Sequence, residues 1–339
     1  MTDHTPRNVL ITGGAGFIGC NFVRYFLDSD PDVRLVDLDL LTYAGDLSNL
    51  EGLPDPDRHT FVKGDICDRE LVDGLFREHE IDTVIHFAAD SHVDRSISGP
   101  APFIQTNFVG TFHLLDAARL YWKDEKKWGD EDCRFHHIST DEVYGSLGPD
   151  DPPFSETTPY APNSPYSASK AGSDHLLRAY QHTFDVPTTL SNCSNNYGPY
   201  QHTEKFVPTV IRSCFEGNKI PIYGDGSNVR DWLYVRDHCT AIDRIVRKGK
   251  LGECYNVGGC NEWSNLELVN KICAIMDEIH PEGAPHTDLM SFVSDRPGHD
   301  WRYAIDMAKI RSELDWEPEE TFETGIRKTV EWYGKLFAK

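Results

Sequence analysis

The chain has 339 residues, of which 39% are hydrophobic and 26% are charged, as is usual for a globular protein. Its net charge of −22 argues against a nucleic-acid partner, because phosphate binding requires a basic surface. We expect neither a membrane span nor a signal peptide, since no run of about 18 apolar residues is present and residues 1–8 are polar. The nine cysteines form no CxxC pair, which favours reduced thiols in the cytoplasm over a disulfide or metal site.

A glycine-rich turn follows the first predicted strand. Residues 8–12, Asn-Val-Leu-Ile-Thr, are typical of a buried parallel strand, and an amphipathic helix is predicted to end near residue 27. Between them lie Gly13, Gly16 and Gly19, at positions that permit a tight turn and the close approach of a pyrophosphate. The N-terminus of the helix favours an anion, so this segment predicts a dinucleotide-binding site.

The next predicted strand, residues 33–38, ends in acidic residues. Asp39 lies 26 positions after Gly13, and Asp37 lies close by, so either carboxylate can bind the hydroxyls of the adenosine ribose. A carboxylate there repels a 2′-phosphate. The expected cofactor is therefore NAD.

Strands and helices alternate along the N-terminal part of the chain. Predicted strands at 61–66, at 83–89 and from 134 alternate with predicted helices at 70–79 and 102–119, and the charged stretch 122–132 is expected to be a surface insertion. This pattern predicts an α/β fold, a Rossmann-type doubly wound parallel sheet with its ligand at the carboxyl ends of the strands. We assign residues 1–190 to an NAD-binding domain. Residues 191–339 form a smaller C-terminal α/β substrate lobe, interleaved with the first because 232–253 is expected to pack back onto it.

Two short segments carry the reactive groups. Thr140, Asp141 and Glu142 follow a buried strand, and Tyr166 and Lys170 are spaced by four residues, so that both lie on one face of a helix. A phenol acts as a base near neutral pH only when a cation lowers its pKa, and Lys170 is placed to do this. Two adjacent carboxyl groups can move two further protons. The combination predicts oxidation of an alcohol followed by an elimination.

Four cationic side chains stand out in the second half of this acidic chain. They are Lys205, Arg230, Arg296 and His299. An anionic substrate needs such a local cluster against the overall negative field, and after a cofactor domain the cluster suggests a diphosphate.

Several motifs together resemble a known family over essentially the whole chain. The glycine turn and Tyr166-x-x-x-Lys170 resemble the extended short-chain dehydrogenase/reductases. The segments at 41–45, 140–145, 194–200 and 295–299 are similar to the dTDP-glucose 4,6-dehydratases, which are hydro-lyases; UDP-glucose 4,6-dehydratases look alike. The resemblance implies tightly held NAD, dTDP-glucose as the nucleotide-sugar substrate, a product used in deoxysugar biosynthesis, and a homodimer formed through helices near 102–119 and 166–184.

The resemblance also implies roles for individual residues. Tyr166 with Lys170 removes the 4-OH proton, Thr140 binds the same oxygen, Glu142 removes the C5 proton and Asp141 protonates the leaving 6-hydroxyl. The residues implied to hold NAD are Gly13, Gly16, Phe17, Ile18, Gly19, Asp39, Asp65, Ile66, Ala88, Ala89, Ser91, His92, Thr106, Tyr166, Lys170 and Asn196. Those implied to line the substrate site are Ser91, Thr140, Asn195, Lys205, Phe206, Pro221, Ile222, Tyr223, Arg230, Asn265, Asp295, Arg296 and His299.

Two alternative functions are compatible with the same fold. A sugar-nucleotide 4-epimerase uses the Tyr/Lys pair but needs no acid and base for elimination, so Asp141 and Glu142 argue against it. A non-catalytic NAD-binding protein is the second alternative, because fold does not determine function. The presence of both Tyr166 and Lys170 argues against that reading.

Overall fold

The computed structural model describes residues 3–295 and 298–337. Its larger lobe is built on a seven-stranded sheet in the order β10-β6-β5-β4-β1-β2-β3, in which all neighbouring strands are parallel. The predicted doubly wound sheet is thus confirmed. The strands are β1 (Asn8–Thr12), β2 (Arg34–Asp39), β3 (His59–Lys63), β4 (Thr83–His86), β5 (Arg134–Thr140), β6 (Thr188–Cys193) and β10 (Cys254–Val257).

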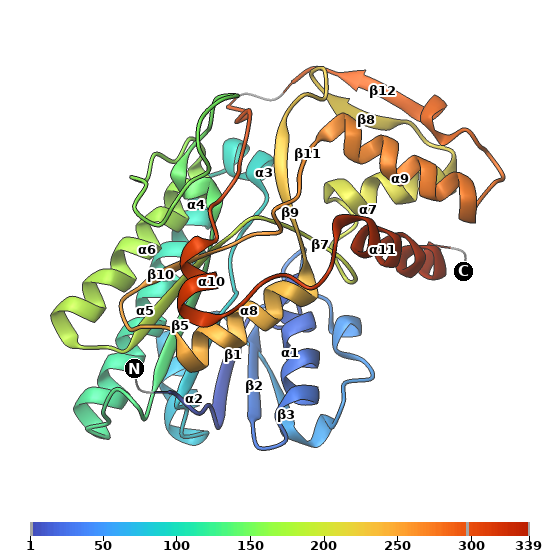
Figure 1. Cartoon of the computed structure of the whole chain (residues 1–339). Coiled ribbons are helices and arrows are strands. Elements are labelled where there is room, and N and C mark those ends of the chain that lie inside the picture. The colour runs from blue at the N-terminus through green and yellow to red at the C-terminus, as the bar shows by residue number, and fades with distance from the viewer. Residues whose placement is uncertain (1–2, 296–297, 338–339) are drawn as a thin grey trace.

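Helices cover both faces of this sheet because successive side chains of its buried strands point to opposite faces. Val9 and Ile11 of β1 pack in one apolar cluster with α1 and α8, which lie side by side in Figure 1. Leu10 belongs to a separate cluster on the other face, with α2, α5 and α6. The helices are α1 (Phe17–Ser29), α2 (Arg69–Glu78), α3 (Val93–Ser98), α4 (Ala101–Phe103), α5 (Thr111–Ala118), α6 (Pro165–Phe184) and α8 (Val235–Lys248).

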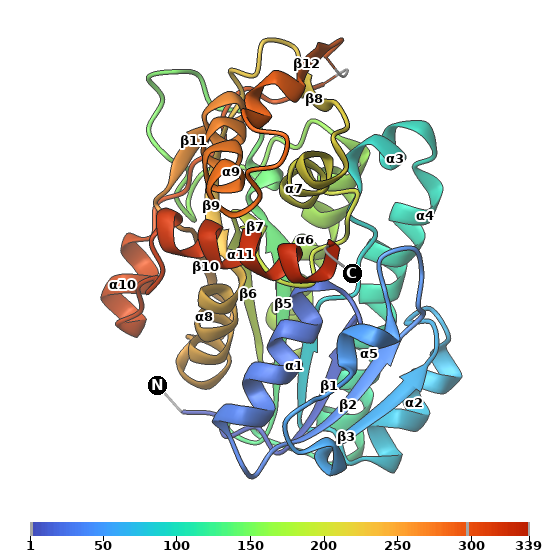
Figure 2. The same cartoon turned by 90° about the vertical axis from the view of Figure 1, so that its right-hand side faces the viewer.

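The second lobe has its own apolar core and lies at the opposite end of the molecule from β2 and β3 (Figure 2). It contains a three-stranded sheet, β11-β9-β7, and a two-stranded sheet, β12-β8. Its elements are β7 (Asn195–Tyr197), α7 (Phe206–Glu216), β8 (Ile220–Tyr223), β9 (Val229–Tyr234), β11 (Glu262–Ser264), α9 (Asn265–Ile279), β12 (Met290–Val293) and α11 (Phe322–Phe337). The short helix α10 (Ala308–Leu314) packs instead on α8 and β10 of the larger lobe. Between β9 and β11 the chain returns to the first sheet, where α8 packs on α1 and β10 pairs with β6.

The stretch 122–132 is largely exposed, as expected for a surface segment, but its first residue, Trp122, is an exception. The helix containing α5 continues as a π-helical segment, Arg119–Glu125, and Trp122 is fully buried against Phe76. The Trp122 indole donates a 2.7 Å hydrogen bond to the carbonyl of Ile81, which explains how its polar atom is accommodated in the core. The charged neighbours of Trp122 lie on the outer side of the same turn. Because of these charges, the sequence pattern did not indicate that Trp122 is buried.

The strand order reverses at β1, which pairs with β2 on one side and with β4 on the other. In doubly wound sheets such a reversal opens a crevice at the carboxyl ends of the strands, where ligands bind. Within the described residues, no helix is long and apolar enough to cross a membrane.

Candidate active site

The glycine turn between β1 and α1 is closely packed against the end of β4. Gly13 has a φ of +77°, and a Cβ atom added there would come within 2.8 Å of the Ala88 backbone. A Cβ on Gly19 would lie 2.2 Å from the Gly13 carbonyl oxygen. Only glycine therefore permits this turn, and the turn directs the free N–H groups of α1 at the crevice, as pyrophosphate binding requires.

The two candidate ribose-binding carboxylates have different positions. Asp37 is fully buried behind the turn, where its carboxylate accepts a 3.0 Å hydrogen bond from the Gly14 amide. Asp39 lines the crevice and accepts hydrogen bonds from the amides of Ala15 and Leu41, at 3.0 and 2.8 Å. Asp37 thus supports the loop, and Asp39 is the carboxylate available to a ribose.

One continuous cleft contains most of the predicted site. It extends from the glycine turn after β1, past the ends of β2, β4 and β5, to Lys205 at the start of α7. All five predicted catalytic residues line it, as do all predicted cofactor residues except His92. The predicted residues in the lining are Gly13, Gly16, Phe17, Ile18, Gly19, Asp39, Asp65, Ile66, Ala88, Ala89, Ser91, Thr106, Thr140, Asp141, Glu142, Tyr166, Lys170, Asn195, Asn196 and Lys205.

The two carboxyl groups predicted to be catalytic, Asp141 and Glu142, lie on a tight turn at the end of β5. Thr140 begins this turn, its hydroxyl accepting a 3.3 Å hydrogen bond from the Glu142 amide, and Gly145 ends it with a φ of +96°. Asp141 is 2% exposed, and burial, reinforced by the charge of Glu142, raises its pKa well above the ordinary value. A carboxyl group that retains its proton beside a second carboxyl is suited to act as a general acid.

Tyr166 and Lys170 lie one turn apart at the start of α6. Ser164 and Ser167 cap this helix reciprocally, which fixes where its first turn begins. The Lys170 ammonium donates to the Ile138 carbonyl at 2.8 Å and lies 3.2 Å from His137 Nε2. Burial lowers the pKa of Lys170 to about 8.

Lys170 does not by itself make Tyr166 acidic. Burial and the charge of Glu142 raise the pKa of Tyr166 well above its ordinary value, and a hydrogen bond with Thr140 offsets this only in part. The protein's own groups therefore leave Tyr166 a protonated phenol. A further cation next to the phenol is required to turn it into a base.

The remaining predicted substrate residues lie outside the lining of this cleft. Phe206 begins α7, Pro221, Ile222 and Tyr223 lie on β8, and Asn265 begins α9. Past β12, the His299 imidazole lies 2.6 Å from the Asp295 carboxylate and packs edge-on against Tyr223. His92, predicted for the cofactor, precedes α3 outside the lining. Arg296 lies outside the described residues.

Arg230 connects this second group with the catalytic turn. Its guanidinium is 6% exposed, donates to the carbonyls of Val229 and Asp300 at 2.7 and 2.8 Å, and lies 4.2 Å from the Tyr303 ring centre. Its positive charge also lowers the pKa of Asp141 against the effect of burial. Arg230 is thus a fixed cation between the catalytic carboxyl groups and the second lobe.

Sequence reasoning missed several residues of the cleft. Asp90 lines it and accepts a 3.2 Å hydrogen bond from Thr106. Cys193, at the end of β6, also lines it, and burial raises the pKa of its thiol to about 12. Asp90 lies in a loop already predicted to meet the cofactor, whereas nothing in the sequence marks Cys193.

The fold and the cleft together define a dinucleotide-binding α/β protein with a Tyr/Lys pair and a carboxyl pair at the carboxyl ends of its strands. A sequence model of the family described as GDP-mannose 4,6 dehydratase matches residues 10–329. A dTDP-glucose 4,6-dehydratase of Escherichia coli is 56% identical over 337 residues, which cover 96% of this chain and 92% of that protein.

Solved structures agree with this relation. A dTDP-glucose 4,6-dehydratase of Bacillus anthracis, in complex with NAD, has a TM-score of 0.86 and 44% identity, covering 97% of each chain. A UDP-glucose 4-epimerase of Thermotoga maritima has a TM-score of 0.85 but 27% identity, covering 97% of this chain and 99% of the other. The chain belongs to the dTDP-glucose 4,6-dehydratase family, within the extended short-chain dehydrogenase/reductases.

Proposed function

We propose that this chain catalyses the NAD-dependent conversion of dTDP-glucose to dTDP-4-keto-6-deoxyglucose and water. The observation that carries the proposal is the Asp141–Glu142 turn: a buried carboxyl group, whose pKa burial raises well above its ordinary value, next to a second carboxyl group in the same cleft as Tyr166 and Lys170. The relatives named above support dTDP-glucose as the substrate and NAD as the cofactor.

The cleft fits NAD on its own geometry. The glycine turn provides a cradle that a Cβ atom would fill, and Asp39 is the carboxylate for the ribose hydroxyls. When bound, NAD supplies a hydride acceptor for C4 and a hydride donor for C6. The residues that would hold it are the cofactor residues named in the lining, from Gly13 on the turn to Asn196 on β7.

The protein's own residues move the protons. Tyr166, assisted by Lys170 and by the positive charge that bound NAD would supply, takes the 4-OH proton, and Thr140 donates a hydrogen bond to the same oxygen. The resulting 4-ketone acidifies the C5 proton, which Glu142 removes. Asp141 gives its proton to the 6-hydroxyl, which leaves as water, and Glu142 returns a proton to C5 after the hydride has reached C6. The proton taken up by Tyr166 is released to solvent, and Asp141 regains one from solvent. The reaction therefore removes one water in total and leaves NAD in its starting oxidation state.

The second lobe is proposed to bind the nucleotide diphosphate. Lys205 lies in the cleft, Arg230 is near enough to lower the pKa of Asp141, and His299 packs on Tyr223 of the second lobe. On this chain of net charge −22, such cations are the groups that a diphosphate requires. We thus propose residues 1–190 as the NAD-binding domain, to which the second lobe adds Asn196, and residues 191–339 as the substrate lobe, to which the first adds Ser91 and Thr140. The nine free thiols suit a cytoplasmic setting.

The proposal is tested by incubating the purified protein with dTDP-glucose, and separately with UDP-glucose, without added NAD. We expect a product lighter than dTDP-glucose by one water, with no net NADH, because the hydride is returned. Faster turnover of UDP-glucose than of dTDP-glucose would show that the nucleotide base of the natural substrate is uracil. Conversion to the galactose isomer at unchanged mass would indicate an epimerase, and it would contradict the roles of Asp141 and Glu142.

A homodimer is part of the same proposal. Ile104, Phe108 and Phe112 are spaced by four residues and are 48%, 37% and 38% exposed, forming an apolar stripe on one helix face. Phe108 packs across Gly172 onto α6, so the stripe continues onto a second helix. A second copy of the chain can cover this surface by presenting the same two helices.

Replacing Phe108 by aspartate is expected to dissociate this dimer, raising its dissociation constant roughly 10- to 100-fold, because an apolar anchor at the centre of an interface becomes charged. Sedimentation equilibrium gives the mass directly. Ile279→Asp, a change of an exposed residue on α9 with 39% exposure, is the matched control and should stay dimeric. A monomeric wild-type protein at micromolar concentration would contradict the proposal.

A further inference from the structure

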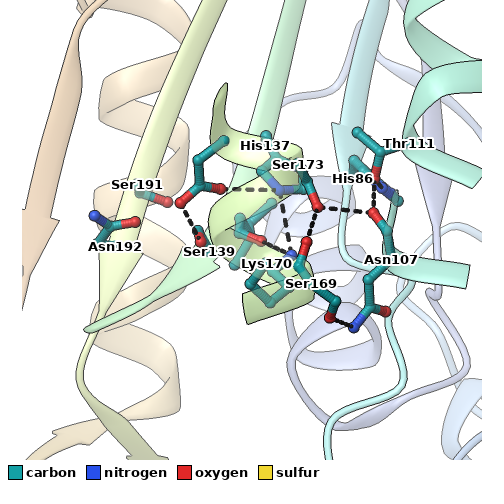
Figure 3. Close-up of polar contacts among 12 residues, drawn as sticks. His86, Asn107, Thr111, His137, Ser139, Ser169, Lys170, Ser173, Ser191 and Asn192 are labelled. Atoms are coloured by element: carbon teal, nitrogen blue, oxygen red, sulfur yellow. Dashed lines mark hydrogen bonds and ion pairs between the residues drawn. The ribbon is translucent and has the colours of Figure 1, made fainter. Parts of the chain in front are cut away.

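Lys170 lines the cleft and is held by a network of buried polar side chains behind it (Figure 3). It is only 4% exposed, and its ammonium contacts the Ile138 carbonyl and His137 Nε2. A buried ammonium loses most of its hydration and is stable only with hydrogen-bond acceptors and a compensating negative charge. Neither direct partner is an anion.

The negative charge is on Asp174, one turn further along α6. Asp174 is 3% exposed, its Oδ1 atom lies 3.4 Å from His137 Nε2, and its Oδ2 atom accepts a 2.8 Å hydrogen bond from Ser139. Its charge raises the pKa of Lys170 against the effect of burial. Burial in turn raises the pKa of Asp174 to about 6, which leaves it largely ionised at neutral pH.

His137 lies between the ammonium and the carboxylate, and a single ring nitrogen faces both. Nε2 can accept a hydrogen bond from Lys170 in one tautomer or donate one to Asp174 in the other, but it cannot do both at once. Burial and the charge of Lys170 hold the pKa of His137 well below its ordinary value, so the ring is neutral. Its Nδ1 atom has no hydrogen-bond partner in the described part of the chain, so no neighbour fixes the tautomer.

The surroundings hold these groups in place and contribute few other charges. Asn107 donates to Ser169 at 2.9 Å and accepts from Ser173 at 2.8 Å, which ties α6 to the preceding helix. Among the described residues, the other titratable groups that face the cluster are His86 on β4, Cys193 on β6, Tyr144 and Tyr160 before α6, His175 on α6 and Cys254 on β10. Burial keeps His86 and Cys193 uncharged at neutral pH, since it lowers the pKa of the first and raises that of the second.

We infer that Asp174, acting across His137, is the counter-charge that keeps Lys170 protonated and in position for Tyr166. Asp174 is a positioning residue: it reaches neither the cleft nor a bound substrate, and it acts through Lys170. The expected effect of Asp174 on catalysis rests on the proposed function. Its expected effect on the protonation of Lys170 does not depend on which substrate the protein uses.

The test is Asp174→Asn, which removes the charge and keeps the shape. A nearby opposite charge favours the ammonium form of a lysine, and its loss favours the neutral amine. We expect NMR of ¹⁵N-lysine-labelled protein, with the Lys170 signal assigned by its absence in Lys170→Met, to show a pKa at least one unit below that of the wild type. The pH above which C4 oxidation slows should fall by a similar amount, since a neutral Lys170 no longer favours a phenolate.

Asp237→Asn is the matched control, a buried aspartate on α8 that accepts a 3.0 Å hydrogen bond from the Glu320 amide. It should leave both the Lys170 pKa and the pH profile unchanged. If Asp174→Asn does not fold, an NMR titration of the wild-type protein tests the inference instead. The Lys170 signal must then shift at the pH where Asp174 titrates, and the Asp174 carboxyl signal must shift at the pH where Lys170 titrates. The inference would be overturned if Asp174 and Lys170 titrate independently of each other. It would also be overturned if Asp174→Asn lowers the rate of C4 oxidation equally at every pH, without shifting the pH above which the rate falls. A protein inactive on dTDP-glucose but with a lowered Lys170 pKa in the variant would contradict only the proposed function.

Discussion

Replacing Glu142 by glutamine is expected to stop the loss of water while the first hydride transfer continues. The amide keeps the shape of the turn but cannot accept the C5 proton, and a general base contributes roughly 10²- to 10⁴-fold to such a step. After mixing with dTDP-glucose, the absorbance of reduced nicotinamide should rise and persist, because the hydride has no C6 acceptor. Mass spectrometry should find no dehydrated product.

The matched control is Glu282→Gln, a change of an exposed glutamate in the second lobe. It should retain wild-type turnover. Dehydration at an undiminished rate in Glu142→Gln would show that another group removes the C5 proton. Failure of both reduction and dehydration would instead mean that Glu142 is needed for binding or for the geometry of the turn that Thr140 begins.

Replacing Tyr166 by phenylalanine is expected to remove both steps together. The phenol is the group that takes the 4-OH proton, and without C4 oxidation the C5 proton is never acidified. Turnover should fall by roughly 10² to 10⁴, and no transient reduced nicotinamide should form. The different absorbance signals of this variant and Glu142→Gln separate oxidation from elimination.

Tyr25→Phe is the control for the loss of a phenol. The Tyr25 hydroxyl donates a 3.2 Å hydrogen bond to Asp243 on α8, outside the catalytic cleft, so its removal should cost some stability and no catalytic rate. Accumulation of reduced nicotinamide in Tyr166→Phe would contradict the role of the phenol. It would point to Thr140, which is hydrogen-bonded to Tyr166, as the proton acceptor.

The sequence alone predicted which reactive groups are close neighbours along the chain. Gly13, Gly16 and Gly19 predict a tight turn, because glycine adopts backbone conformations that other residues avoid and these three are spaced as in a dinucleotide-binding turn. Tyr166 and Lys170 share a helix face because four residues make about one turn. Asp141 and Glu142 are neighbours in sequence, so they are neighbours in space in any fold. Alternation of strand and helix then places all three motifs at one edge of a parallel sheet.

Other features depended on which side chains the fold buries. Asp37 and Asp39 are equivalent in sequence, and only the packing of the turn shows that Asp39 faces the cleft. Trp122 was concealed among charged residues until the helix placed it against Phe76.

The sequence by itself determined the class of fold, the reactive groups and their order along the chain, because periodicity and short-range spacing are local properties. The tertiary structure decided the protonation states, because desolvation and charge depend on neighbours that are distant in sequence. Burial keeps a proton on Asp141 and Tyr166, opposes the charge of Lys170, and brings Asp174 and His137 to the same site.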